Sequence, residues 1–303
     1  MASPYHNVER HVGFVDRKAG SLPREPSGNF GSLRVGAVRI TRRIAAPLAL
    51  RIAGFGTVVA VWTAAASQLR EIQLPSPVLV LQALQDNFVD AGGLHFAGVE
   101  GGYWSNTMYT VSNALLAFGL GSALGFTAGV LSARLQFVRD ASMPVLILFG
   151  TVPSLVAAPF VMIWTGPGQL GQLAIVAFYA FVIVALASQN AALHLPPRYE
   201  DVASTLGASV SRSLWTIVVP STIPSVVSAI RSAFAVSLTL QVAGELFGSP
   251  LGVGRVIAAS QSVGYTAGGI AVVLLLATVG AVFDAIAYGA LRWLSRWQLT
   301  LSR

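Results

Sequence analysis

The chain alternates long apolar runs with shorter polar stretches. Each run is long enough to cross a bilayer as a helix, because about 20 consecutive apolar residues span its hydrocarbon core. We expect six transmembrane helices, at about 45–69, 108–132, 141–165, 173–193, 221–247 and 267–294. The pattern predicts an all-α, polytopic membrane protein.

The first 43 residues contain Pro, Gly, Ser and many basic residues and lack such a run. They predict a basic, disordered cytoplasmic tail over 1–43, followed by a transmembrane domain over 44–303. The charged leader is too long for a signal peptide, and the first apolar run is close to a full span. We therefore expect a transmembrane helix there.

A polar stretch at 199–220 reads YEDVASTLGASVSRSLWTIVVP and interrupts the apolar runs. The two prolines before it suit the first turn of a helix, and Gly207 can take the left-handed conformation that ends one. Ser209 can cap a second helix, whose apolar residues lead to Pro220, where the next span begins. We expect a helical hairpin over 197–220.

Composition supports a membrane protein. Hydrophobic residues make up 54% of the chain, charged residues 10%, and the mean hydropathy is +0.68, whereas about 25% of residues in soluble domains are charged. Cys is absent and the four His form no ligand pair at helical spacing, so we expect no metal site. The net charge of +7 lacks the pattern of nucleic-acid binders, and we attribute it to topology and to contact with membrane lipid.

The basic residues indicate the orientation, because cytoplasmic loops are enriched in Lys and Arg. Only Arg70 and Arg255 fall on one side of the predicted spans. Fifteen basic residues fall on the side that holds both termini and the hairpin, namely Arg10, Arg17, Lys18, Arg24, Arg34, Arg39, Arg42, Arg43, Arg134, Arg139, Arg198, Arg212, Arg292, Arg296 and Arg303. We expect both termini and the hairpin in the cytoplasm.

Two segments are then expected outside, at 70–102 and 248–266. Within the first, residues 74–84 predict a turn with prolines and a short amphipathic helix that is too brief to span. We expect this helix to lie along the membrane surface.

Several residues within the spans are candidates for a translocation path. Pro153 and Pro159 would kink the third span where a neighbour or a cavity satisfies the freed carbonyls. Arg231, Gln241 and Glu245 are polar residues of the fifth span. Arg231 and Glu245 are about 21 Å apart along the helix and cannot pair. Glu245 either lines the path or serves in capping and packing at the outer end of its helix.

Other features of the spans predict packing between helices. Gly121, Gly125 and Gly129 repeat every four residues and form a face that allows two helix backbones to approach closely. Asp284, in the sixth span, is expected to form a hydrogen bond to another helix.

No catalytic motif accompanies these features. The chain has no H-E-x-x-H helix, no G-x-S-x-G elbow and no pair of carboxylates within one apolar span. It also lacks a G-x-x-x-x-G-K-[ST] phosphate loop. We therefore expect no catalytic residue and no ATP hydrolysis in this chain, and a membrane-embedded enzyme has no support. A stand-alone ion-coupled carrier or channel is the alternative to an importer subunit.

The hairpin also carries a recognisable motif. From Asp201 the sequence reads D-V-A-S-T-L-G, then nine residues, then I-V-V-P. This resembles the motif E-A-A-x3-G-x9-I-x-L-P in permease subunits of binding-protein-dependent ABC importers. The residues at or directly before the motif positions are Glu200, Asp201, Val202, Ala203, Gly207, Ile217 and Pro220. Asp201, Val202 and Val219 depart from the Glu, Ala and Leu of the motif.

The resemblance extends from about residue 74 to the C-terminus. It includes LPSP at 74–77, VPSLVAAPFVMIW at 152–164 and GELFG at 244–248, which are most similar to the nitrate, sulfonate and taurine permease group. It implies the type I (MetI-like) permease fold, a bacterial inner membrane, and a translocation path for a small anion such as a sulfonate, taurine or nitrate.

The resemblance also implies partners. The hairpin would dock on a cytoplasmic ATPase subunit, with Ala203 and Gly207 allowing close approach. That subunit would use ATP and Mg, and this chain would bind no cofactor. A solute-binding protein would dock outside, near 74–102 and 249–265. Because a symmetric pathway needs two permeases, we expect a homodimer.

Overall fold

A computed structural model of the chain describes residues 50–166, 168–196 and 198–294. By its contacts the chain divides into two units, Met1–Thr57 and Val58–Arg303. The helix Leu50–Ala66 starts in the first unit and ends in the second, and the later helices all belong to the second unit. The predicted tail over 1–43 lies outside the described residues.

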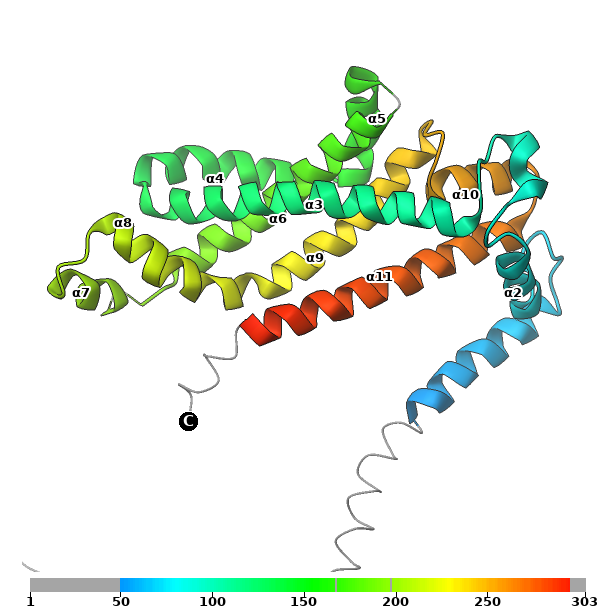
Figure 1. The fold of residues 1–303 in the computed structure, drawn as a ribbon, viewed down its shortest axis with the longest axis horizontal. Helices are drawn as coiled ribbons and strands as arrows, with labels where there is room; N and C mark the ends of the chain where they lie inside the picture. The colour runs from blue at the N-terminus through cyan, green and yellow to red at the C-terminus, as the bar shows by residue number, and fades with distance from the viewer. Residues whose placement is uncertain (1–49, 167, 197, 295–303) are drawn as a thin grey trace, which may run out of the picture. The chain divides into compact units, whose positions relative to one another are not determined.

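All regular elements of the described residues are helical, as the apolar runs predict (Figure 1). After Leu50–Ala66 they are α2 Pro77–Asp86, η1 Gly92–Ala97, α3 Tyr103–Arg134, α4 Gln136–Thr151, α5 Ser154–Thr165, α6 Gln169–Leu193, α7 Arg198–Thr205, α8 Val210–Ser213, η2 Leu214–Val218, α9 Val219–Leu246, α10 Val253–Ser262 and α11 Thr266–Leu294. Of these, η1 is a 3₁₀ helix and η2 is a π-helical turn.

Four helices are long and apolar enough to cross a membrane, which confirms a multi-pass membrane protein. They are Tyr103–Arg134, Gln169–Leu193, Ser211–Leu246 and Thr266–Ala290. A fifth crossing is available if the bent pair α4 and α5 counts as one span. The apolar helix Leu50–Ala66 is shorter, and the first five residues of the predicted first span are outside the described part. The count of six spans stays a prediction.

The third predicted span differs from its expectation. Instead of one kinked helix over 141–165, the structure has α4 and α5, which meet at an angle of 100°. Val152 at the junction has an extended backbone, with φ −68° and ψ 125°, and Pro153 follows it. A residue before proline is driven out of the helical region by its steric clash with the proline ring. This pair of residues therefore breaks the helix, while Pro144 and Pro159 remain inside α4 and α5.

The core of the membrane domain is formed by α3, α6 and α9, which lie side by side (Figure 1). Gly121, Gly125 and Gly129 face α6, where a Cβ on any of them would collide with backbone atoms. The predicted glycine face is thus confirmed. Without these glycines the two helices could not reach their present separation, because helix association in a bilayer depends on close van der Waals contact.

A second apolar cluster joins α2, η1, α10 and the first turns of α11. Its fully buried members are Ala91, Leu94, Val99, Tyr103, Val253, Val256, Ala271 and Val272. The predicted short helix at 74–84 is present as α2, capped by Ser76, whose Oγ accepts from Leu79 N. The two segments that we expected outside the membrane therefore share one hydrophobic core.

Candidate functional site

The polar stretch folds as the expected helical hairpin, and Gly207 forms its turn. Gly207 has φ +74°, in the left-handed region that glycine adopts without steric cost. Ala208 N donates to Ala203 O at 3.0 Å, and Gly207 N donates to Ser204 O at 3.0 Å. These bonds satisfy the last carbonyls of α7. Gly207 thus ends the first helix, as its sequence position predicts.

The second helix of the hairpin is continuous with the following span, which corrects the expectation of a boundary at Pro220. Ser209 caps it, since its Oγ accepts from Arg212 N at 3.3 Å. The backbone then runs through α8, η2 and α9 as one candidate span, Ser211–Leu246. Pro220 has no N–H to donate to the preceding turn. The carbonyl four residues earlier, that of Thr216, lies in the π-helical turn η2, which ends two residues before Pro220.

The hairpin divides its motif residues between an exposed surface and its own interior. Val202 is 58% exposed and Leu206 is 82% exposed, and Asp201 is exposed beside them. Ala203, which we expected at the contact with a partner, is only 4% exposed and is therefore covered by this chain. Ile217 and Pro220 are half-buried. Glu200 belongs to α7, and its side chain and Pro197 lie outside the described residues.

The proline candidates lie on the bent pair. Pro153 is the residue directly before α5, and Pro159 lies inside it. On α5 Ala158 and Met162 are buried, while Ile163 and Trp164 are strongly exposed. One face of α5 therefore packs on α6 and α9, and the other is free of this chain.

Arg231 pairs with Asp284, which confirms the predicted bond between Asp284 and another helix. The guanidinium of Arg231 on α9 donates through Nε to Asp284 Oδ1 on α11, at 2.8 Å, and through Nη2 to Oδ2. The Tyr288 ring lies 4.7 Å from the guanidinium carbon. The pair opens onto an apolar cavity of about 510 Å³ between α9, α10 and α11. Arg231 therefore serves to hold α11 against α9, and its charge is balanced.

Glu245 and Gln241 belong to a buried polar network at the C-terminal end of α9. Glu245 is 1% exposed. Its Oε2 accepts from Thr110 Oγ1 on α3 and from Gly254 N on α10, both at 2.9 Å. Its Oε1 accepts from Gln241 Nε2 at 3.0 Å, and the same nitrogen donates to Gln172 Oε1 on α6 at 2.8 Å. The carboxylate thus bonds donors from three helices.

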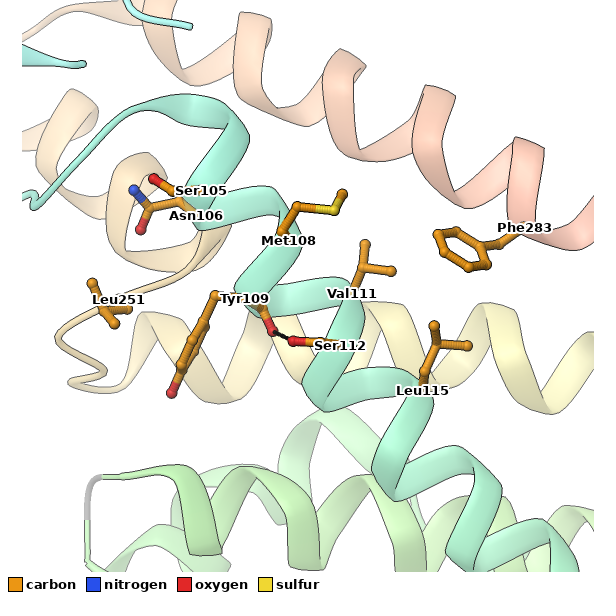
Figure 2. Close-up of a pocket in the computed structure, with 9 residues that line it drawn as sticks. All are labelled: Ser105, Asn106, Met108, Tyr109, Val111, Ser112, Leu115, Leu251 and Phe283. Carbon is orange, nitrogen blue, oxygen red and sulfur yellow. Dashed lines mark hydrogen bonds between the residues drawn. The ribbon is translucent and has the colours of Figure 1, made fainter. Parts of the chain in front are cut away.

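A groove on α3 lies beside this network (Figure 2). It encloses about 460 Å³ and is lined by Ser105, Asn106, Met108, Tyr109, Val111, Ser112, Leu115, Leu251 and Phe283, none of which is charged. Figure 2 shows Leu251, from the segment before α10, next to the N-terminal turns of α3. The polar groups of the groove are three hydroxyls and one amide.

The sequence reasoning missed the partners of these polar residues. Thr110 and Asn106 on α3 and Gln172 on α6 are all buried, although each lies in an apolar span. The polar residues themselves were a signal in the sequence, because polar residues inside spans rarely face lipid and tend to bind one another. What local patterns do not give is which helices pair.

Comparison with known proteins agrees with the motif in the hairpin. Residues 121–298 match the model of a family described as the binding-protein-dependent transport system inner membrane component. The taurine transport system permease protein TauC of Escherichia coli (strain K12) is 26% identical over 227 residues, which cover 71% of this chain and 78% of TauC. The "Putative aliphatic sulfonates transport permease protein SsuC" of Bacillus subtilis (strain 168) is 25% identical over 228 residues, covering 74% of this chain and 78% of SsuC.

A solved structure shares the fold. One chain from the inward-facing conformations of the MetNI methionine ABC transporter superposes with a TM-score of 0.55 at 18% identity. The match covers 63% of this chain and 95% of that one. At this identity the likeness speaks for the fold alone.

Proposed function

We propose that this chain, which belongs to the family of binding-protein-dependent transport system inner membrane components, forms the path for a small anionic solute in an ATP-driven importer. Its role as a transmembrane permease subunit of an ABC importer, with the type I (MetI-like) fold, follows from the family and the apolar helices. The observation that supports a solute path powered by a separate ATPase is the exposed hairpin motif within a chain that matches the family.

Organic sulfonates are the substrate class that the relatives favour. TauC and SsuC are named for taurine and aliphatic sulfonates, which share one sulfonate group on a short carbon chain. Nitrate, from the resemblance of the sequence, is the smaller alternative anion. In such a system the binding protein would select the solute, and the permease would need only to admit a small anion.

The hairpin is proposed as the contact with a separate ATPase subunit. Val202 lies on α7 and Leu206 directly follows it, one helical turn further on, with its N–H donating to Val202 O. Both side chains are apolar and strongly exposed. An exposed apolar pair on a short helix suits docking into a groove of a partner. ATP and Mg would be used by that partner, while this chain would bind neither. Ala203 would act indirectly, by allowing the hairpin to close.

The remaining assignments concern the assembly. The family and the bacterial relatives support a bacterial inner membrane protein, and the arginine distribution supports both termini in the cytoplasm. A solute-binding protein would then dock on the opposite face, over the segments that share the core of α2, η1 and α10. Two copies of this chain would enclose the path, since a symmetric pathway needs two permeases.

The test is ATP-driven uptake of taurine by proteoliposomes that contain the permease, its ATPase and its binding protein. Leu206→Asp is expected to lower uptake at least tenfold, because a buried charge at the docking face costs more than about 1.4 kcal/mol. Ser204→Asp, on the opposite, exposed face of α7, is the matched control and should keep most of the uptake.

Two results would contradict the proposal. Equal uptake by Leu206→Asp and the unchanged chain would show that the hairpin does not couple transport to the ATPase. Uptake by the permease without ATPase and binding protein would favour the stand-alone carrier or channel.

A further inference from the structure

The N-terminus of α10 is capped by side chains from two other helices. Its first N–H groups point away from the helix and have no partner within it. Gly252 N donates to Asn106 Oδ1 at 2.8 Å, Val253 N donates to Thr110 Oγ1 at 2.9 Å, and Gly254 N donates to Glu245 Oε2. Three successive donors are thus satisfied by α3, which is far from α10 in the sequence, and by the end of α9, which precedes α10.

Glu245 is the charged member of this cap. A carboxylate near a helix N-terminus is favoured, because the aligned peptide dipoles leave partial positive charge there. Within the described residues Glu245 forms no ion pair, so these dipoles and its three hydrogen bonds are what compensate its burial. The carboxylate therefore keeps its hydrogen bond to Gly254 only while α10 stays in its present position. In turn, the N-terminus of α10 needs the carboxylate as an acceptor.

Two glycines allow this fit. Gly252 has φ +105°, and a Cβ there would collide with the carboxylate of Glu245. A Cβ on Gly254 would lie 2.5 Å from Val242 O and 2.6 Å from Glu245 Cβ. The segment approaches α9 closely because both positions lack a side chain.

On its other side α10 holds the segment before α3. Arg255 donates through Nη2 to Ala97 O at 2.6 Å and through Nε to Gly98 O at 3.1 Å. Arg255 therefore binds α10 to the 92–98 region, and Glu245 binds α10 to the end of α9. The second helix of the hairpin continues into α9 as one candidate span, Ser211–Leu246. This span therefore runs from the hairpin, with its proposed ATPase contact, to the cap of α10.

We propose that Glu245 is a positioning residue that fastens the start of α10 to α3 and α9, and that it does not contact the transported solute. Both carboxylate oxygens are occupied by donors of this chain, and a buried negative charge would repel an anion. The inference deepens the proposed function. It makes α10, and with it the proposed surface for the binding protein, follow the movement of α9.

Substitutions of Glu245 distinguish a role as hydrogen-bond acceptor for the N-terminus of α10 from a role in packing alone. In Glu245→Gln one oxygen remains for Thr110 and Gly254, and the new NH₂ group faces Gln241. If the amides of Gln241 and Gln172 both rotate by 180°, Gln241 offers an oxygen to both neighbours and the contacts are restored. In Glu245→Ala the N–H of Gly254 and the hydroxyl of Thr110 lose their acceptor in a buried place.

The test measures backbone hydrogen exchange over 252–256 in the full chain, held in lipid nanodiscs. Glu245→Ala is expected to speed exchange about tenfold or more, because a buried unpaired donor weakens local structure. Glu245→Gln should stay within about threefold of the unchanged chain, since its hydrogen bonds are retained. Thr110→Val, which keeps the volume and removes the hydroxyl, should give an intermediate increase and serves if the Ala variant does not fold.

Gln189→Ala is the matched control. Gln189 is fully buried and donates to Ser132 Oγ at 2.8 Å, between α3 and α6 and away from α10. It should leave exchange over 252–256 unchanged. The proposal is overturned if Glu245→Ala or Thr110→Val exchanges like the unchanged chain, if Glu245→Gln is as fast as Glu245→Ala, or if Gln189→Ala accelerates the same segment.

Taurine uptake separates this inference from the proposed function. In proteoliposomes with the ATPase and binding protein, Glu245→Gln should retain uptake and Glu245→Ala should lose most of it. If the unchanged chain takes up no taurine, the proposed substrate is wrong, whereas hydrogen exchange still decides the role of Glu245.

Discussion

Two kinds of single-residue effect recur in this chain: glycines that make room for a neighbouring backbone or side chain, and charged residues that are neutralised by a partner. The glycines of α3 leave out a side chain where α6 approaches, and the glycines before α10 do the same beside Glu245. Arg231 and Asp284 balance each other between α9 and α11. Arg231 was a candidate for the translocation path, and its pairing gives it a structural use that the sequence did not reveal.

Gly125→Ala should destabilise the membrane domain. A Cβ there would meet the Phe181 carbonyl oxygen at 2.5 Å and its Cα at 3.0 Å, and backbone atoms cannot move aside. We expect a loss of about 1–3 kcal/mol, as for other overpacked interfaces. Thermal unfolding in detergent, followed by size-exclusion chromatography, measures this loss.

Gly119→Ala is the control, in the same helix but with open space around it, and should unfold at the same temperature as the unchanged chain or higher. Equal unfolding temperatures for both variants would contradict the close contact.

The helices and the hairpin turn could be predicted from neighbouring residues, whereas contacts between distant helices could not. The apolar runs gave the helices within a few residues, and Gly207 and Ser209 gave the turn of the hairpin, because these effects depend on neighbouring residues alone. The break at Val152 is also a local effect, caused by the proline after it, although the apolar run predicts one kinked span. The bond of Glu245 to Thr110 joins helices that are distant in sequence, and no local pattern encodes it.

Gly207→Ala should loosen the hairpin without a steric clash. Nothing lies within 4 Å of a Cβ at this position, so the cost comes only from placing a side chain at φ +74°. That cost is about 1 kcal/mol, or about fivefold in the population of opened hairpins. Trypsin cleavage at Arg212, which is exposed, should rise accordingly. Gly207→Asn should be milder, because Asn tolerates this conformation, and an Asn variant cleaved faster than the Ala variant would argue against this explanation.

The second unit, Val58–Arg303, combines two ends of unlike chemistry. One end carries the hairpin, with its exposed apolar pair, and the other carries the compact cluster of α2, η1 and α10. The continuous stretch from Ser211 to Leu246 connects them. The proposed importer would use this connection to relate an ATPase on one face to a binding protein on the other.

The orientation can be tested directly because the chain has no Cys. Single-cysteine variants Phe96→Cys and Leu206→Cys place exposed thiols at the two ends, where these residues are 79% and 82% exposed. A membrane-impermeant maleimide should label Phe96→Cys on intact spheroplasts, and Leu206→Cys only after lysis, as the arginine distribution predicts. Labelling in the reverse order would invert the topology.

The π-helical turn η2 has a consequence for the relation between these two ends. It holds one residue more than an α-helical turn would, and each residue of an α-helix advances the side chains by about 100°. Because this wider turn takes up the extra residue, removing one residue from Leu214–Val218 would allow an ordinary helix and leave α9 at nearly the same angle to the hairpin. If the same residues were wound as an α-helix instead, α9 would turn by about 100° and Glu245 would point away from Thr110 and Gly254. The π-helical turn thus preserves the angular phase between the ATPase contact proposed for one end and the cap at the other.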